Sequence, residues 1–177
     1  MMLVQVTEPV SLEEHLVRKA ADGDRAAFGE LYSRYARVVH AILLGRVRCD
    51  AAEDLVQDVF LTALSHLSHL RERNSFAAWI YTIARNRAHD FHRAEPLHEE
   101  IREEHLQGRP APPEALEALQ AIRNLPDAYR EVLMMRLVEG MTGPEIALRT
   151  GLKPESVRVN LCRGMKMLRE TIEGKTV

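Results

Sequence analysis

Apolar residues recur along most of the chain at the spacing of one face of an α-helix. Between Phe28 and Leu43, apolar side chains return every three or four residues, and the same period continues over 11–21, 50–67, 76–93, 114–123 and 127–138. No stretch alternates apolar and polar residues over the length that a half-buried strand needs. The pattern therefore predicts an all-α protein. Asp50 and Asp127 are the N-caps that the sequence predicts for the helices 50–67 and 127–138.

The clearest element boundaries lie near the C-terminus. Thr142 is a good N-cap there, and Glu145 can complete a capping box. Gly151 is suited to end this first helix, and Pro154 to open a second one. The residues expected on the buried stripe of the second helix are Val157, Leu161, Gly164 and Leu168.

The outward face of this second helix would be basic. It would carry Glu155, Arg158, Val159, Cys162, Arg163 and Lys166. A short helix, a glycine turn and a second helix with an exposed basic face are typical of a helix-turn-helix, whose second helix enters the major groove of DNA. A helical hairpin with a merely solvated charged face is the alternative that this segment alone leaves open.

The helical period fails between residues 94 and 113. Four prolines and one glycine interrupt this segment, and acidic side chains crowd it. We expect a flexible acidic linker with room for one short helix near 97–106. The linker would join two small helical domains, residues 11–93 and residues 114–174, the second of which ends in the helix-turn-helix.

The net charge of −2 hides an uneven distribution of charge. The segment from Arg71 to Arg93 carries five Arg against two acidic residues, and that from Thr142 to Val177 carries seven Lys or Arg against four Glu, so each is +3. Between them, Glu95 to Glu117 holds seven Glu and two Arg, which gives −5. We interpret the basic segments as DNA-facing modules, although chance variation in a charged surface is the alternative.

Asp54, Gln57 and Asp58 form a regular polar face on the predicted helix 50–67. Periodicity alone favours simple solvation of this face. Acidic and amide groups at spacings of three and four could also dock a basic partner helix, which is the second interpretation.

Basic and aromatic side chains lie together in the predicted helix 76–93. Arg85, Asn86 and Arg87 follow the aromatic residues Phe76, Trp79 and Tyr81. This combination is typical of proteins that bind single-stranded DNA, because the charges contact phosphates and the rings stack on bases. The aromatic residues could instead belong to the core, and for Trp79 the core is the better interpretation.

No residue pattern predicts catalysis, a metal site or a cofactor. The sequence lacks HExxH, CxxC and glycine-rich phosphate-loop motifs, and the pair His66 and His69 has no further ligands nearby. Cys49 and Cys162 fit free thiols in a reducing compartment. Since neither a membrane-spanning run nor a signal peptide is apparent, we expect a cytoplasmic protein that is not an enzyme.

Five runs of the sequence match one known family in order. They are AFGELYSRYARVV, AEDLVQDVFLTAL, SFAAWIYTIARNRAHDFHR, LPDAYREVLMMRLVEGMTGPEIALRTGL and SVRVNLCRGMKMLRE. Together they resemble a bacterial sigma factor of the sigma-70 family, over nearly the whole chain except the linker. The small two-domain arrangement is similar to the extracytoplasmic-function (ECF) group. The resemblance implies a promoter-specificity subunit that binds core RNA polymerase and starts transcription from −10 and −35 promoter elements.

The resemblance also implies a role for each surface. The polymerase β′ clamp would bind Asp54, Gln57 and Asp58, and the β flap would bind the helix-turn-helix. Residues that would melt and bind the −10 element are Arg71, Arg73, Asn74, Ser75, Arg85, Asn86 and Arg87. Residues that would bind the −35 element are Lys153, Glu155, Ser156, Arg158, Val159, Arg163 and Lys166. An anti-sigma factor is an expected partner, and the free chain could pack both modules together and mask both DNA-binding faces.

One departure from the family concerns the last helix. Around Val159 and Cys162 it has fewer small polar and basic residues than is usual, so we expect contacts with thymine methyl groups there. Three other hypotheses are a single-module transcription regulator, a helical adaptor that binds only proteins and, more distantly, a metal-dependent enzyme.

Overall fold

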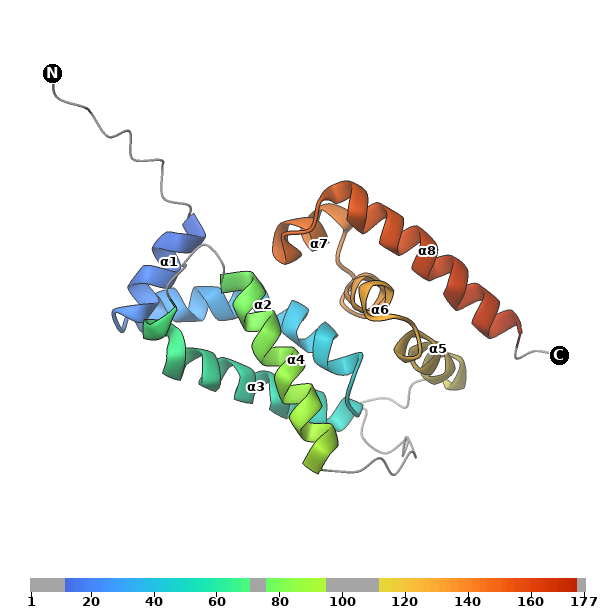
Figure 1. Ribbon diagram of the computed structural model, residues 1–177, viewed down its shortest axis with the longest axis horizontal. Coiled ribbons are helices and arrows are strands. Elements are labelled where there is room, and N and C mark those ends of the chain that lie inside the picture. The colour runs from blue at the N-terminus through green and yellow to red at the C-terminus, as the bar shows by residue number, and fades with distance from the viewer. Residues whose placement is uncertain (1–11, 71–75, 95–111, 175–177) are drawn as a thin grey trace, which may run out of the picture.

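The computed structural model describes residues 12–70, 76–94 and 112–174. Every regular element in these ranges is helical, which confirms the predicted all-α fold (Figure 1). The N-terminal unit consists of α1 (Leu12–Ala21), α2 (Arg25–Leu44), α3 (Cys49–His66), η1 (Leu67–His69) and α4 (Phe76–Ala94). The C-terminal unit consists of α5 (Pro113–Arg123), α6 (Asp127–Leu133), η4 (Met134–Val138), α7 (Gly143–Thr150) and α8 (Pro154–Glu173).

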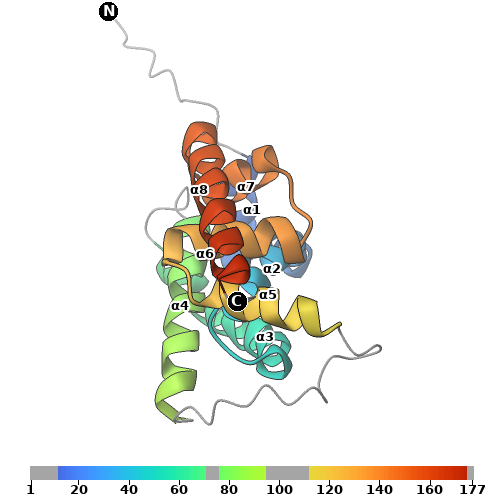
Figure 2. The same cartoon turned by 90° about the vertical axis from the view of Figure 1, so that its right-hand side faces the viewer.

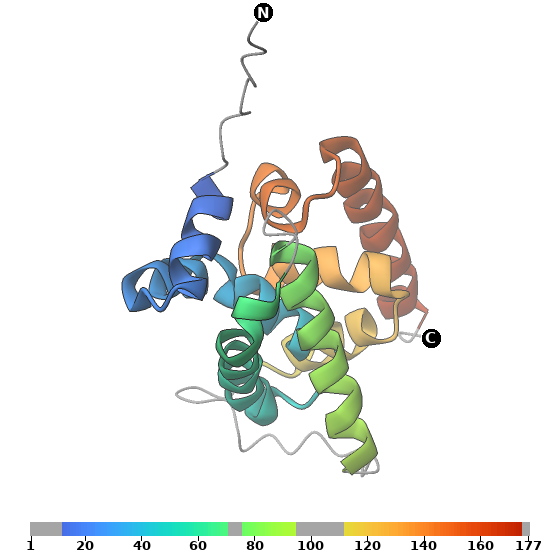
Figure 3. The ribbon, with the colours of Figure 1, turned by 60° about the vertical axis from the view of Figure 1, so that its left-hand side comes forward.

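Helix α2 is the centre of the N-terminal unit. Asp24 caps its start by accepting hydrogen bonds from the backbone N–H groups of Ala26 at 2.9 Å and Ala27 at 3.1 Å. Because α1, α3 and α4 all pack against α2, much of its surface is buried. Figure 3 shows α4 running beside α3, with the C-terminal unit on its other side.

Two N-caps predicted from the sequence are wrong. Helix α3 begins after Arg48, whose backbone is extended, so Asp50 lies inside the first turn and pairs with Arg48 at 3.3 Å. Helix α6 likewise begins after Pro126, and Asp127 is its first residue. In both helices an aspartate stabilises the N-terminal end from within the first turn, where the helix dipole favours negative charge.

The predicted helix 127–138 changes its winding part-way along. It is α-helical up to Leu133 and continues as the π-helical segment η4 from Met134 to Val138. A π turn holds one residue more in each hydrogen-bonded ring than an α turn, which alters which side chains face inward. Met134 and Met135 in this segment are both buried.

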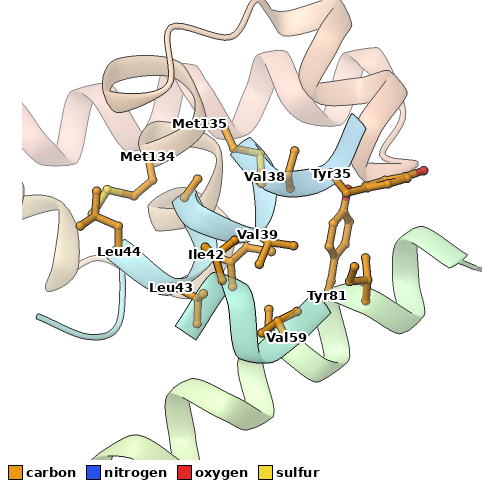
Figure 4. Close-up of a cluster of buried hydrophobic side chains, with 14 of the residues drawn as sticks. Tyr35, Val38, Val39, Ile42, Leu43, Leu44, Val59, Tyr81, Met134 and Met135 are labelled. Atoms are coloured by element: carbon orange, nitrogen blue, oxygen red, sulfur yellow. The ribbon is translucent and has the colours of Figure 1, made fainter. Parts of the chain in front are cut away.

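The same two methionines join the cores of the two units. Figure 4 shows Met135 beside Val38 and Met134 beside Leu44, so that the π-helical segment lies against α2. Buried side chains of both units belong to one continuous hydrophobic cluster. The described part of the molecule is therefore closed, with the C-terminal unit packed on the N-terminal one.

Candidate nucleic-acid and polymerase interfaces

The start and end of α7 follow the capping signals in the sequence. The Thr142 hydroxyl accepts a hydrogen bond from the Glu145 N–H at 3.4 Å, and the Glu145 carboxylate accepts one from the Thr142 N–H at 2.7 Å. The Glu145 carboxylate also accepts a hydrogen bond from the Thr142 hydroxyl at 2.7 Å, and the backbone and hydroxyl donors of Thr142 together lower the pKa of the Glu145 carboxyl. Gly151 ends the helix with φ of +70°, a conformation that glycine adopts at little cost. Local contacts thus define both ends of α7, and Gly151 begins the turn that leads to α8.

The inward stripe of α8 confirms the sequence-based prediction. Val157, Gly164 and Leu168 are buried, and Leu161 is half-buried. A Cβ atom at Gly164 would lie 3.1 Å from Leu133 Cδ1, so glycine allows α8 to approach α6 closely. Figure 2 shows α8 on the outside of the C-terminal unit, which leaves its opposite face to solvent.

That opposite face is exposed and basic. Its exposed members are Lys153, Glu155, Arg158, Val159, Arg163 and Lys166, while Ser156 is half-buried. Within the described residues, Arg158 and Arg163 have neither an ion-pair nor a hydrogen-bond partner, and Lys166 lies 3.8 Å from Glu170. Unpaired guanidinium groups on an exposed helix are available to phosphate oxygens and to the acceptors on guanine.

Asp54, Gln57 and Asp58 are exposed on a single face of α3. None of the three has an ion-pair or hydrogen-bond partner in the part of the chain that is described. Leu61 continues the same face at helical spacing and is 61% exposed. The face is therefore free to meet a partner, and its charge favours a basic one.

The residues of α4 that are predicted to bind the −10 element differ in their hydrogen-bond partners. Arg85 donates hydrogen bonds to the Glu131 carboxylate at 3.0 and 2.8 Å, and these bonds raise the pKa of its guanidinium group. Arg87 donates to the Thr62 hydroxyl at 2.8 Å, and Asn86 is exposed without a partner among the described residues. The other predicted −10 residues, Arg71, Arg73, Asn74 and Ser75, lie outside the described residues.

Two of the aromatic residues near these positions are core residues. Phe76 and Tyr81 are buried, so neither is available to stack on bases. The Tyr81 hydroxyl donates to the Arg149 carbonyl oxygen of α7, and burial raises the pKa of this hydroxyl. The suggestion that both contribute to a single-stranded DNA surface is therefore wrong.

Trp79 packs partly buried against the hydrophobic core, which agrees with the role favoured from the sequence, and it also borders an open hollow of about 490 Å³. The hollow is lined by Thr62, His66, His69, Leu70, Trp79 and Ile83. The sequence singled out His66 and His69 only as a pair without further metal ligands, and it did not predict this hollow. The available signal was the helical spacing that aligns Thr62 with His66, and Trp79 with Ile83, on facing sides of two adjacent helices.

Neither a metal centre nor a membrane span occurs among the described residues. No three His, Cys, Asp or Glu side chains there are grouped to hold a metal ion. None of the described helices is both long enough and apolar enough to cross a bilayer.

Comparison with known proteins identifies the family. The family models for sigma-70 region 2 and sigma-70 region 4 match residues 31–96 and 115–168. The RNA polymerase sigma factor CarQ of Myxococcus xanthus is 31% identical over 160 residues, which cover 85% of this chain and 92% of CarQ. The chain belongs to the sigma-70 family of RNA polymerase sigma factors. Relatives named as ECF sigma factors assign it to the extracytoplasmic-function group.

Other relatives of this sigma factor agree with that assignment. The probable RNA polymerase sigma factor RfaY of Xanthomonas campestris pv. campestris is 32% identical over 173 residues, and this chain spans only 43% of its length. The solved structure of CnrH in complex with the cytosolic domain of CnrY matches with a TM-score of 0.58 and 26% identity, covering 93% of this chain and 99% of CnrH. The matched region 2 contains α3 and α4, and the matched region 4 contains α7 and α8 as far as Leu168.

Proposed function

We propose that this sigma factor binds core RNA polymerase and directs it to promoters with a −10 and a −35 element. The observation that carries the proposal is the helix-turn-helix with an exposed basic face, in a chain of the sigma-70 family. Arg158 and Arg163 on this face have no partner among the residues that the structure describes. In this proposal α8 enters the major groove of the −35 element. The guanidinium groups fix its position on the duplex, and Val159 contacts a thymine methyl group.

The N-terminal module, residues 11–93, supplies the other two contacts in the proposal. Asp54, Gln57 and Asp58 dock on a basic helical surface of the β′ clamp. The segment 71–75 and the following helix up to Arg87 hold the melted −10 strand through phosphate contacts and through capture of an unstacked base. The core enzyme supplies the catalysis, and a polymerase partner implies a cytoplasmic location.

A protein antagonist is part of the same proposal. CnrH was solved in complex with the cytosolic domain of CnrY, and this chain matches CnrH over nearly its whole length. We therefore expect an anti-sigma factor that binds this chain and keeps it from core polymerase.

Dependence of DNA binding on core polymerase tests the proposal. A sigma factor whose modules are spaced by the polymerase should bind duplex promoter fragments much more tightly in the holoenzyme than alone, because the second module then binds at high effective concentration. Equal DNA affinity with and without core polymerase would contradict the proposal and support a single-module transcription regulator.

A further inference from the structure

Glu155 is the only acidic residue among those proposed to bind the −35 element. It lies in the first turn of α8 and is exposed, between the cations Lys153 and Arg158 in the sequence. The N-terminal unit does not cover this side of α8, so the expectation that the closed chain masks both DNA-binding faces is wrong for α8 (Figure 2). The Glu155 carboxylate is therefore as accessible to DNA as the basic side chains around it.

The fold makes no visible use of the Glu155 carboxylate. In the part of the chain that is described, it forms neither an ion pair nor a hydrogen bond, although Arg158 follows three residues later. In α7, by contrast, the Glu145 carboxylate accepts a hydrogen bond from the backbone of the N-cap residue. An acidic group in the first turn is favoured by the helix dipole, but this attraction alone does not require a position on the DNA-facing side.

An unpaired carboxylate on a DNA-binding surface lowers the affinity for most sequences. The phosphates of DNA are negatively charged and repel it. This repulsion is offset where the carboxylate meets a hydrogen-bond donor on a base. The donors in the major groove are the N4 amino group of cytosine and the N6 amino group of adenine. Glu155 therefore disfavours every base that presents only acceptors at its position.

Of the two possible donors, cytosine suits a carboxylate better. Adenine presents the acceptor N7 beside its N6 amino group, whereas cytosine presents only the N4 donor in the major groove. Because an ionised carboxylate has acceptors alone, it gains a hydrogen bond from either base but is repelled by the N7 lone pair of adenine. An amide side chain has a donor as well, which is why Asn and Gln pair with N6 and N7 of adenine.

The place of Glu155 along α8 suits contact with base edges. In a helix-turn-helix, the N-terminal residues of the second helix are those that contact base edges. Glu155 follows Pro154, the first residue of α8, and Val159 comes four residues later on the same face. Four residues advance about 6 Å along a helix, and successive base pairs are about 3.4 Å apart. The base that Glu155 contacts should thus lie about two base pairs from the thymine proposed for Val159.

We propose that Glu155 selects a cytosine in the −35 element by accepting a hydrogen bond from the N4 amino group of that base. The proposal rests on the function proposed above for α8. The basic side chains supply affinity for any duplex through its phosphates. Glu155 supplies selectivity, because the other bases at this one position leave its charge without a partner.

Selection from a promoter library tests this assignment. The library has a constant −10 element and a randomised −35 region, and the binding partner is holoenzyme assembled from core polymerase and the full-length chain. We expect the wild type to enrich cytosine about tenfold over the other bases at one position. Glu155→Gln should shift the preference at that position to adenine, and Glu155→Ala should abolish it.

Glu173→Gln is the matched control. It removes the same charge from an exposed residue at the far end of α8 and should select the wild-type sequence. Affinity for a duplex without a −35 element gives a second readout. Both Glu155 variants should bind this duplex more tightly than the wild type, because the repulsion from phosphates is lost. A residue that only stabilised the helix would weaken binding to all duplexes alike, and circular dichroism would report the loss of helix.

An unchanged base preference in Glu155→Gln and Glu155→Ala would overturn the proposal, as would a selected −35 element without a cytosine. A failure of the proposed function has a different signature. Wild-type holoenzyme would then enrich no −35 sequence, although core polymerase binds the chain, and that result would overturn both proposals.

Discussion

Gly164 is the residue that sets how closely α8 packs on α6. In Gly164→Ala the new methyl group would lie 3.1 Å from Leu133 Cδ1 and 3.2 Å from Tyr129 Cβ, and Leu133 is fully buried. Overpacking costs about 1–3 kcal/mol, and the better helix propensity of alanine offsets about 1 kcal/mol of this cost. We expect urea denaturation to give a free energy of unfolding lower by about 1 kcal/mol.

Gly29→Ala is the matched control for that prediction. Gly29 is exposed within α2, and a Cβ there would meet nothing within 4 Å. This substitution should therefore stabilise the protein by about 0.5–1 kcal/mol through helix propensity alone. Equal stabilisation by Gly164→Ala would contradict the close contact between α8 and α6.

Arg163 carries a second prediction at the residue scale. Because this side chain is exposed and unpaired among the described residues, Arg163→Ala should weaken holoenzyme binding to a −35 duplex without affecting stability. If Arg163 contacts a phosphate, the slope of log affinity against log salt should fall by about one. Arg18→Ala removes the same charge from α1 and should leave both affinity and slope unchanged. Loss of affinity in Arg18→Ala of the same size would contradict the assignment.

The sequence predicts the role of a residue well when that role depends on neighbours a few positions away. It does not predict contacts between residues that lie far apart in the chain. Thr142, Glu145 and Gly151 were placed correctly because capping depends on spacings of only a few residues. Glu131 was not singled out, because its partner Arg85 lies 46 residues earlier in the chain. The cap predictions at Asp50 and Asp127 failed because an extended residue immediately before each helix moved the start of that helix.

At the scale of elements, the exposed face of α3 is the surface that we expect to bind core polymerase. The double variant Asp54→Asn, Asp58→Asn keeps side-chain volume and removes both charges, so it should weaken core polymerase binding about tenfold or more while helical content stays the same. Fluorescence anisotropy with labelled protein measures this affinity. Asp22→Asn with Glu30→Gln removes the same charge from exposed positions elsewhere and should bind like the wild type. If the α3 variant bound core polymerase with wild-type affinity, the proposed docking role of this face would be contradicted.

Apolar periodicity predicted the positions of the helices, but it predicted neither the π-helical segment nor the hollow between α3 and α4. The period over 127–138 predicted one continuous helix, whereas the segment Met134–Val138, which packs against α2, is π-helical. The hollow beside Trp79 also depends on how α3 and α4 are placed, which a one-dimensional pattern does not contain. Periodicity reports which face of a helix is buried, but not which element covers it.

At the scale of the whole molecule, two units share one hydrophobic cluster and an ionic interface. The break in the helical period predicted two modules on either side of a linker, and only the resemblance to the family implied that the free chain could pack them together. The sequence offered no means to tell which surface would be covered. The resemblance to the sigma-70 family, which the family matches confirm, allowed a function to be proposed for each surface.

The most direct test of the central claim is run-off transcription of fragmented genomic DNA by core polymerase, with and without this chain, followed by mapping of transcript 5′ ends. The account predicts new, discrete start sites that share two upstream elements at a fixed spacing. It also predicts that these starts disappear with the Asp54→Asn, Asp58→Asn double variant. Core polymerase that binds the chain yet shows no new start sites would contradict the proposed promoter-specificity function.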